Sequence, residues 1–512
     1  MTAANPPSEI VGVVGAGLMG RGIAQVAAQA GFEVRLFDAK PGAATDARRA
    51  IAEVLTSLAA KGKVSTESAA VAVARIALPD ALDGLRGCSL VIEAIVERLE
   101  AKQALFKALE DVVGDSCVIA TNTSSLSVTA IAGACAHPDR VAGLHFFSPV
   151  PLMKLVEVID GLLTAPALVA RLLAFGAALG HTAVRAKDTP GFIVNHAGRG
   201  YGTEALRIAG EGIADFAAID RILKLACGFR MGPFELFDLT GLDVSHPVME
   251  SIYHQYYEEA RYRPSPITAQ RLAAGVLGRK SGRGFYDYPA TAPASATRPS
   301  TAAPAAAPDF TPPVWVSATN TEARAAVVDL LGRLGATLDR GAAPSGAALC
   351  LVLPVGRDAT SAALDEHLDP TRTLALDTLV DTARQRTLMA TPVTSSAELD
   401  SARALFARDG AVVEVIHDSP GFVVQRVLAH IVNVACDIAQ QRIASPVDID
   451  LAVRVGLGYP QGPLAWGDAL GPARLLRILQ ELHAAYGDPR YRPSLWLSRR
   501  ARLGVSLLTP EG

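Results

Sequence analysis

The chain contains few cysteines, and no two of them have the spacing of a metal-binding or redox motif. Six cysteines are scattered through 512 residues, and none forms a CxxC pair. We therefore expect small buried thiols in a reducing compartment, with no disulfide framework and no metal site. The six are Cys88, Cys117, Cys135, Cys227, Cys350 and Cys436.

Long apolar runs and a strong net charge are also missing. No uninterrupted apolar stretch reaches membrane-spanning length, and Met1 to Glu9 lack the basic start and apolar run of a signal peptide. The formal net charge is only −3, and no block of Lys or Arg is long. A nucleic-acid-binding surface is therefore not expected. The sequence predicts a cytoplasmic protein without a membrane or nucleic-acid partner.

Length and apolar content are plentiful, in contrast. Half of the residues are hydrophobic and 19% are charged, which is ample for globular folding. A chain of 512 residues is too long for one ordinary core. We expect three or more packed units.

A glycine-rich turn near the start predicts a dinucleotide site. The apolar run Ile10–Val14, typical of a buried parallel strand, leads into the GxGxxG motif at residues 15–20, and a predicted helix over 22–30 follows. In such a motif Gly15 permits the tight turn, Gly17 lets the pyrophosphate approach, and Gly20 allows helix and strand to pack closely. The helix N-terminus then receives the phosphates.

The end of the next predicted strand indicates which dinucleotide is bound. Glu33–Phe37 ends at Asp38, 18 residues after Gly20. A carboxylate at this place bonds the ribose hydroxyls and repels a 2′-phosphate. NAD, rather than NADP, is the predicted cofactor.

Further apolar runs extend the pattern to a doubly wound, Rossmann-like sheet. Polar helical stretches separate most of these runs, as in βαβ units. The runs are Ser89–Ala94, Cys117–Thr121, Val141–His145 and Leu155–Ile159. Ligands of such sheets bind at the carboxyl ends of the strands. The polar segment Thr121–Ser125 and His145 should therefore meet in one crevice.

His145 and Glu157 together indicate acid–base chemistry. An imidazole ordinarily titrates near neutral pH, so it can take a proton from an alcohol. A partly buried carboxylate behind it fixes the tautomer and stabilises the imidazolium. This pairing, downstream of a dinucleotide motif, favours alcohol oxidation by hydride transfer.

At these residues the chain resembles the 3-hydroxyacyl-CoA dehydrogenase family. The resemblance covers roughly residues 8 to 290 through several specific motifs, and the longer architecture extends it to the end. The motifs are GAGLMGRGIA at 15–24, VIEAIVERLEAK at 91–102, TNTSSLS at 121–127, GLHFFSPVPLMKLVEV at 143–158, DTPGFIVN at 188–195 and RKSGRGFYDY at 279–288.

The resemblance implies a role for each matching residue. His145 is implied as the general base with Glu157 as its partner, while Ser124 bonds the substrate and Asn195 steadies the catalytic groups. Lys61 is implied to meet the coenzyme A phosphates of the substrate. The implied cofactor contacts are Gly15, Gly17, Leu18, Met19, Gly20, Asp38, Glu97, Lys102, Ser124, Ser148 and Lys280.

Two positions depart from the family pattern. The family commonly has HFFNP, and here Ser148 replaces the Asn that contacts the nicotinamide side; it also has GFIVNR, and here His196 follows Asn195. Ser148 keeps a hydroxyl but is shorter, so looser nicotinamide positioning is expected. Neither change touches the acid–base pair.

The second half of the chain repeats part of the first. Residues 188–195 recur as 418–425, an offset of 230, and the same offset carries Gly232-Pro233 onto Gly462-Pro463 and Asp238 onto Asp468. Two copies of one helical unit are therefore predicted. They could pack on each other as a pseudo-dimer, and a homo-oligomer, dimer or trimer, is a further possibility.

The segment between the copies resembles a reduced first domain. After an Ala/Pro-rich linker at 289–313, four strand-like runs lie within 314–417, without a GxGxxG. We interpret Asp377-Thr378-Leu379 as the counterpart of Asn122-Thr123-Ser124, and Gln425 as that of Asn195. This half is expected to act as a scaffold and not in redox chemistry.

The predicted fold class is thus α/β plus all-α, in five segments. A Rossmann-like domain (1–187) precedes a helical domain (188–288) and the linker (289–313). A degenerate α/β domain (314–417) and a second helical domain (418–512) follow.

The resemblance implies NAD-dependent oxidation of a (3S)-3-hydroxyacyl-CoA to a 3-oxoacyl-CoA. The long architecture resembles the branch that acts on 3-hydroxyadipyl-CoA in bacterial phenylacetate breakdown, and Arg199 is a candidate for its terminal carboxylate, although a surface or interface arginine is the alternative. Two other readings stay open: oxidation of 3-hydroxybutyryl-CoA in fatty-acid or butanoate metabolism, or a non-catalytic NAD-binding relative. Retention of Ser124, His145, Glu157 and Asn195 favours an enzyme.

Overall fold

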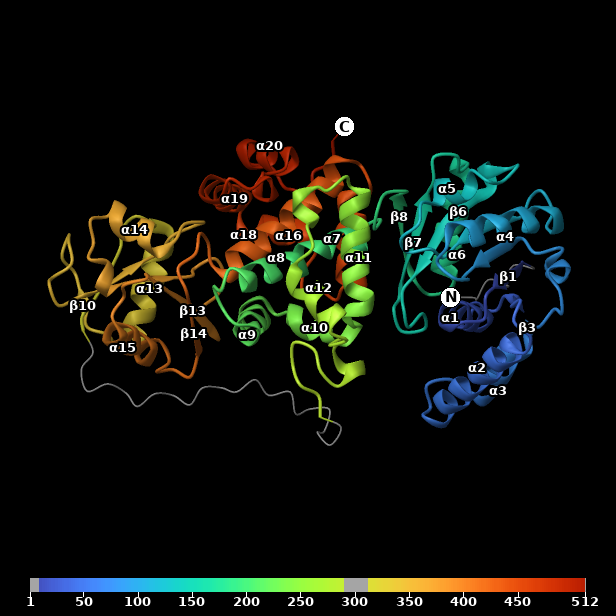
Figure 1. Cartoon of the computed structure of the whole chain (residues 1–512), viewed down its shortest axis with the longest axis horizontal. Coiled ribbons are helices and arrows are strands. Elements are labelled where there is room, and N and C mark those ends of the chain that lie inside the picture. Colours follow the sequence, from blue (N-terminus) through green and yellow to red (C-terminus); the bar gives the residue numbers. More distant parts are fainter. Residues whose placement is uncertain (1–8, 290–311, 512) are drawn as a thin grey trace, which may run out of the picture. The chain divides into compact units, whose positions relative to one another are not determined.

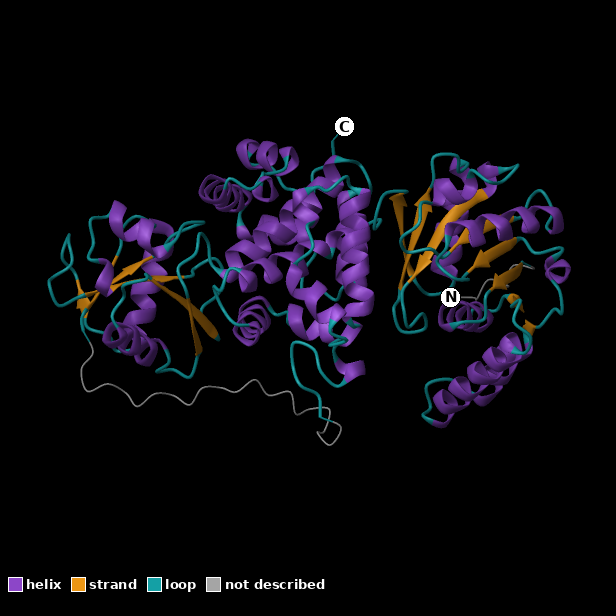
Figure 2. Cartoon of the chain, viewed as in Figure 1, coloured by secondary structure: helices purple, strands orange, loops and turns teal. Residues whose placement is uncertain are grey.

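The computed structural model describes residues 9–289 and 312–511, and these residues form two compact units. Unit 1 comprises Met1–His196 together with Gln441–Leu457, and unit 2 comprises Ala197–Gln440 together with Gly458–Gly512. Most of the predicted linker lies outside the described residues. The bounds of the five predicted segments stay predictions. Figure 1 labels the elements and Figure 2 shows the sheets and the helices around them.

Unit 1 is built on one eight-stranded sheet of order β3-β2-β1-β4-β5-β6-β7-β8. All neighbouring strands are parallel except β6 and β7, which are antiparallel. The strands are β1 (Ile10–Val14), β2 (Glu33–Phe37), β3 (Ile76–Ala77), β4 (Leu90–Glu93), β5 (Val118–Thr121), β6 (Val141–Phe146), β7 (Leu155–Asp160) and β8 (Thr182–Lys187). The predicted doubly wound, Rossmann-like sheet is confirmed.

Helices cover both faces of this sheet. One buried cluster joins the strands to α1, α2, α3 and α6, and another joins them to α4 and α5. The helices are α1 (Leu18–Gln29), α2 (Ala43–Ala60), α3 (Thr66–Ala74), α4 (Leu99–Val112), α5 (Val128–Ala132), α6 (Pro166–Ala178), α7 (Val194–Ala197), which crosses into unit 2, and α17 (Pro446–Gly456), with 3-10 turns η1 (Leu82–Leu85) and η2 (Pro138–Arg140). Helices α2 and α3 form a hairpin that projects from the sheet (Figure 1).

Unit 2 contains a helical bundle in which the two sequence repeats meet. Helix α8 of the first copy packs along α16 of the second, and an added Cβ at Gly200 would lie 3.0 Å from the Ile431 backbone. The helices are α8 (Arg199–Gly210), α9 (Phe216–Cys227), α10 (Pro233–Thr240), α11 (Leu242–Gln255), η3 (Ala260–Tyr262), α12 (Pro266–Ala273), η4 (Arg279–Ser281), α16 (Val423–Gln440), α18 (Pro463–Leu470), α19 (Pro472–Tyr486), η6 (Pro489–Tyr491) and α20 (Leu495–Leu503).

The remainder of unit 2 is a six-stranded sheet of order β10-β9-β11-β12-β13-β14. Only β12 and β13 pair antiparallel. The elements are β9 (Val314–Val316), α13 (Thr321–Arg333), β10 (Leu338–Asp339), β11 (Leu349–Val352), α14 (Ala359–Asp365), η5 (Pro370–Arg372), β12 (Thr373–Leu376), β13 (Gln385–Ala390), α15 (Ser396–Phe406) and β14 (Val412–Ile416). The predicted small second α/β segment is confirmed.

The sheet pairing corrects one correspondence between the halves. Because β12 pairs antiparallel with β13 as β6 does with β7, Asp377 follows β12 as Phe147 follows β6. The interpretation of Asp377-Thr378-Leu379 as the counterpart of Asn122-Thr123-Ser124 is wrong. The short run Leu353-Pro354-Val355, which follows β11, occupies that place and leads into α14 as the earlier loop leads into α5.

Among residues 9–289 and 312–511, no helix is both long and apolar enough to cross a membrane.

Candidate active site

The glycine-rich turn after β1 has the geometry that a dinucleotide needs. Gly15 has a φ of 101°, and an added Cβ there would lie 2.5 Å from the Ala94 carbonyl oxygen. A Cβ on Gly20 would overlap the Gly15 carbonyl oxygen, whereas Gly17 has no atom within 4 Å of such a Cβ. The turn is therefore closed on the protein side and open at Gly17, where a pyrophosphate can approach the backbone. Leu18 is 60% exposed and Met19 is half-buried.

Asp38 lies at the end of β2 and is tied to this turn. Its Oδ2 accepts a hydrogen bond of 2.7 Å from the Ala16 N–H, and its Oδ1 accepts one of 2.8 Å from the Lys40 N–H. The carboxylate is half-buried, so it retains surface for a ligand. These residues fit the adenosine half of NAD, because the turn is open to a pyrophosphate and the carboxylate stands beside it.

His145 and Glu157 lie opposite each other on β6 and β7. Because the two strands pair antiparallel in this register, both side chains emerge on the same face of the sheet. His145 Nδ1 lies 2.7 Å from Glu157 Oε2. His145 is 4% exposed and Glu157 is fully buried. The carboxylate thus holds the Nδ1 proton and leaves Nε2 as the basic nitrogen.

Glu157 is itself fixed by the backbone that follows β8. Its Oε1 accepts hydrogen bonds of 3.0 Å from the N–H groups of Ile193 and Val194. With one oxygen on the backbone and the other on His145, the carboxylate has no freedom to turn. Asn195, which is predicted to steady the catalytic groups, follows directly in α7 and is half-buried.

Glu97 organises the polar loop that carries Ser124. Its Oε1 accepts hydrogen bonds from the Thr123 hydroxyl at 2.6 Å and from the Ser124 N–H at 2.9 Å, and also from Ser125. Partial burial works to raise the pKa of Glu97, but the Thr123 hydroxyl, Lys102 and the Ser124 N–H hold it below its ordinary value. Glu97 therefore stays ionised and shapes the loop.

Lys102 is buried beneath this loop. Its Nζ lies 2.6 Å from Glu93 Oε1 and 3.2 Å from Glu97 Oε2, and Glu93 also accepts from the Thr121 hydroxyl at 2.7 Å. The lysine acts on the loop through these carboxylates. Direct contact of Glu97 or Lys102 with the cofactor stays a prediction.

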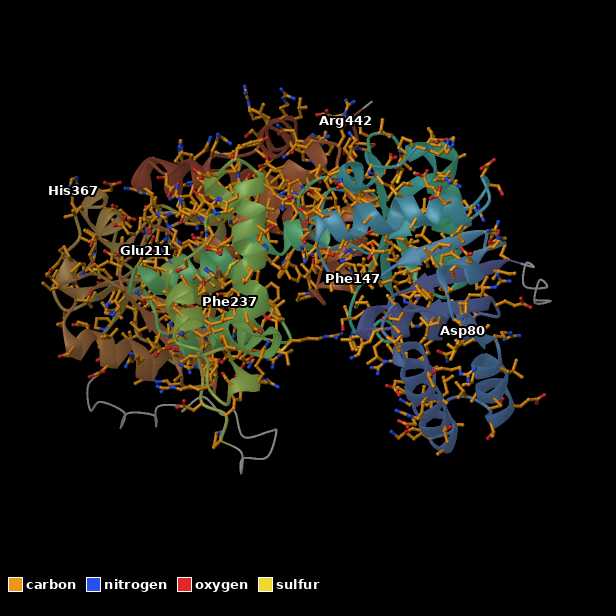
Figure 3. All side chains as sticks on the ribbon, turned by 45° about the vertical axis from the view of Figure 1, so that its right-hand side comes forward. Asp80, Phe147, Glu211, Phe237, His367 and Arg442 are labelled. Atoms are coloured by element: carbon orange, nitrogen blue, oxygen red, sulfur yellow. The ribbon has the colours of Figure 1, made fainter. Side chains whose placement is uncertain are left out.

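The remaining predicted site residues lie in several places. Lys61 is exposed at the end of α2, and Ser148 is exposed after β6. Phe147, labelled in Figure 3, has its ring centroid 4.4 Å from that of His145. In unit 2, Lys280 is exposed and its Nζ lies 2.5 Å from Asp243 Oδ1.

Two positioning residues were not assigned a role from sequence. Asn122 Oδ1 accepts a hydrogen bond of 2.8 Å from the Phe146 N–H and so ties the polar loop to β6. Asp188 accepts hydrogen bonds from the Ser127 hydroxyl and from the N–H groups of Val128 and Thr129 at the start of α5. Both lie within quoted motifs, and the recurrence of Asp188 as Asp418 was the available signal.

An open glycine turn and a buried imidazole–carboxylate pair on one mostly parallel sheet define an oxidoreductase that uses a dinucleotide. The family model for the NAD-binding domain of 3-hydroxyacyl-CoA dehydrogenase matches residues 10–189, and the model for the C-terminal domain of that family matches residues 191–288 and 421–506. The chain belongs to the 3-hydroxyacyl-CoA dehydrogenase family, and it is an NAD-dependent enzyme.

Relatives fall into a long and a short form. A 3-hydroxyadipyl-CoA dehydrogenase of Escherichia coli K12 is 38% identical over 97% of this chain and 98% of its own length. A probable 3-hydroxybutyryl-CoA dehydrogenase of Bacillus subtilis is 42% identical but covers 54% of this chain and 96% of its own length. The crystal structure of a 3-hydroxybutyryl-CoA dehydrogenase from E. coli K12 has a TM-score of 0.83 at 36% identity, over 97% of this chain and 99% of its own.

Proposed function

We propose that the chain oxidises 3-hydroxyadipyl-CoA to 3-oxoadipyl-CoA with His145 as the general base. The observation that carries the acid–base assignment is the 2.7 Å contact between His145 Nδ1 and Glu157 Oε2. The acyl chain is proposed from the full-length relative of that name, which shares the second half that shorter relatives lack.

In the proposed reaction, Nε2 of His145 takes the proton of the 3-hydroxyl. Glu157 stabilises the imidazolium that forms, and its two backbone hydrogen bonds keep it from rotating away. NAD, which the glycine turn at 15–20 and Asp38 would hold, would supply the hydride acceptor for C3. Ser124 and Asn195 hold the substrate oxygen that becomes a ketone, and Lys61 meets the phosphates of coenzyme A.

Arg199 is proposed to recognise the terminal carboxylate of the adipyl chain. Burial lowers the pKa of this guanidinium to about 10, while nearby Tyr459 works in the opposite direction, so Arg199 remains charged at neutral pH. A carboxylate paired with a poorly hydrated guanidinium forms a strong hydrogen bond. If Arg199 instead only stabilises its own helical unit, its replacement should change kcat/KM equally for all substrates.

A second candidate substrate is 3-hydroxybutyryl-CoA, favoured by the name of the E. coli structure with a TM-score of 0.83. The two are separated by kcat/KM for both thioesters, with NAD and NADP side by side. We expect the adipyl substrate to be preferred by roughly tenfold or more, and NAD over NADP. Arg199→Ala should remove the adipyl preference and leave the butyryl kcat/KM within about twofold. Equal or inverted preference in the unmodified enzyme contradicts the adipyl assignment.

The pseudo-dimer and the oligomeric state are part of the proposal. Packing of α8 on α16 supports the view that the second helical copy takes the place of a partner subunit. The face of the first copy that would otherwise meet a partner subunit is then covered. We therefore expect no dimer through this face, and light scattering of the purified chain measures this. A dimer that is dissociated by substitution of Gly200 contradicts this view.

A further inference from the structure

Helix α17 belongs to the second repeat but packs within unit 1. It is the counterpart, at an offset of 230 residues, of α9 in the first copy. It contacts β7 and β8, and the segment before it is joined to the end of β8 by a 2.8 Å hydrogen bond from the Lys187 N–H to the Ile443 carbonyl. The reciprocal arrangement exists in unit 2, where α9 packs on β13 and the His417 N–H donates to the Ile213 carbonyl at 2.9 Å. The two copies have thus exchanged one helix each.

The end of α17 is seated against two residues that flank Glu157. A Cβ added at Gly456 would lie 2.7 Å from Leu155 Cδ2 and 3.0 Å from Val194 Cγ2. Leu155 is two residues before Glu157, so both project from the same face of β7. Val194 donates its N–H to Glu157 Oε1. Gly456 therefore packs against one of the two residues whose N–H groups hold the Glu157 carboxylate, and against the neighbour of Glu157 on the same face of β7.

The opposite face of β7 is covered by a different helix. A Cβ on Gly176 of α6 would lie 2.7 Å from Val156 Cγ1, which projects from that other face. The face that bears Leu155 and Glu157 depends on α17 instead. Helix α17 also buries Ile449, Ala452 and Val453.

The glycine at 456 is not a requirement of the repeat itself. The equivalent position of the first copy is Ala226, within α9. A methyl group is therefore compatible with this helix where it packs on the degenerate sheet. The absence of a side chain is specific to the copy that packs beside Glu157.

We infer that α17 positions the catalytic pair, with Gly456 as its positioning residue, so that the second half of the chain contributes to turnover although it lacks an acid–base pair of its own. This inference rests on the proposed role of His145 and Glu157. Because Val194 is β-branched and stiff, a side chain at 456 displaces its backbone N–H along with it. The Glu157 carboxylate then loses its fixed angle to His145.

The test uses the full-length enzyme with Gly456→Ala and the bulkier Gly456→Val. The matched control is Gly467→Ala in α18, where a Cβ would lie 2.5 Å from Leu507 Cδ1 and 2.8 Å from Val432 Cγ1, all within unit 2. We measure kcat, KM for both substrates, melting temperature and the pH profile of kcat/KM. A displacement of a fraction of an ångström should lower kcat roughly tenfold for Gly456→Ala and further for Gly456→Val.

The expected pattern separates positioning from simple destabilisation. For Gly456→Ala, KM should stay within about twofold, and the acid limb of the pH profile should move to lower pH because the imidazolium is less stabilised. Gly467→Ala should lose a similar amount of thermal stability but keep kcat within about twofold. Adding Leu155→Val, which shortens the overlapping side chain, should restore part of the lost kcat.

A folded Gly456→Ala enzyme with unchanged kcat and pH profile overturns the inference, as does an equal loss of kcat in Gly467→Ala. If Gly456→Val does not fold, the Ala variant alone decides. Failure of the proposed function is distinguishable, because the unmodified enzyme would then fail to oxidise any 3-hydroxyacyl-CoA.

Discussion

Single glycines in the turn after β1 have separate tasks that can be measured apart. Gly20 lacks a side chain because the Gly15 carbonyl occupies the space, whereas nothing in the described protein fills the space beside Gly17. The first is a packing requirement and the second is room for a ligand. The sequence motif contains both and does not by itself distinguish them.

Gly17→Ala and Gly20→Ala should therefore fail in different ways. Gly20→Ala should destabilise unit 1, by about 1–3 kcal/mol, because the added methyl group overlaps the backbone. Gly17→Ala should leave the melting temperature unchanged and raise the Kd for NAD at least tenfold. Calorimetric melting and NAD titration of both variants measure this, and a loss of stability in Gly17→Ala with normal NAD affinity contradicts it.

The chemistry of the residues was enough to predict the acid–base pair, but not all of the contacts around that pair. His145 and Glu157 were identified because an imidazole and a carboxylate in that setting have one evident use, and their contact follows from the antiparallel register. Lys102 is buried against Glu93, an ion pair that the sequence did not indicate, and its predicted contact with the cofactor stays a prediction. A lysine in sequence does not show which carboxylate the fold brings to it.

At the scale of elements, most strands were predictable from their apolar residues, whether continuous or alternating, whereas β8 and β13 were not. Six runs in the first half correspond to β1, β2, β4, β5, β6 and β7. Strand β13 begins with Gln385 and Arg386, which are buried because Thr387 and Asp409 satisfy them. Strand β8, at the edge of the sheet, exposes Arg185 and Lys187. Both strands depend on contacts with residues distant in sequence, which the hydrophobic pattern does not reveal.

One repeated carboxylate allows the two halves to be compared at this scale. The two oxygens of Asp188 each accept from one of the first two N–H groups of α5, and those of Asp418 pair in the same way with α14. Removing either carboxylate exposes a helix start that charge-assisted hydrogen bonds stabilise. Only α5 follows the loop with Ser124.

Asp188→Ala and Asp418→Ala should each cost about 1–3 kcal/mol of stability in the unit that contains them. Asp188→Ala should also lower kcat roughly tenfold, since the loop before α5 loses its anchor. Asp418→Ala should leave kcat within about twofold. Paired melting curves and steady-state assays measure this, and an equal loss of activity in both variants is the contrary result.

At the scale of the whole chain, the offset of 230 residues predicted the duplication. It did not predict that α9 and α17 each pack on the sheet of the other copy, because a repeat fixes which helices exist and not which surfaces they cover. The same offset carries residues 122–124 onto 352–354, next to the run that follows β11, and so agrees with the corrected counterpart of the Ser124 loop.

The helical copies in unit 2 are joined by a buried charge cluster. Glu204 is fully buried, with one oxygen 2.9 Å from Arg426 Nε and the other 2.7 Å from Arg490 Nε. Burial works to raise the pKa of Glu204, but Arg426 and Arg490 lower it to about 2. Glu211 and Tyr491 complete the cluster (Glu211 is labelled in Figure 3).

Glu204→Gln should destabilise unit 2 by about 3–5 kcal/mol at pH 7, because two buried guanidinium groups lose their counter-ion. A carboxyl with a lowered folded pKa stabilises above its unfolded pKa, near 4.3, and this stabilisation is lost as pH falls toward 2. The difference in urea midpoint should therefore narrow below pH 4. Glu322→Gln, at an exposed pair with Arg474, is the control and should cost less than about 1 kcal/mol. A difference in urea midpoint between Glu204→Gln and the unmodified enzyme that does not change with pH contradicts the lowered pKa of Glu204.

The most direct test of the account is kcat of His145→Gln, with Glu157→Gln beside it. Loss of the acid–base group should lower kcat roughly 10²–10⁴-fold while the Kd for NAD and the melting temperature stay near those of the unmodified enzyme. Glu157→Gln should lower kcat less, because the imidazole remains. A His145→Gln enzyme that keeps most of its kcat would show that the proton leaves by another route.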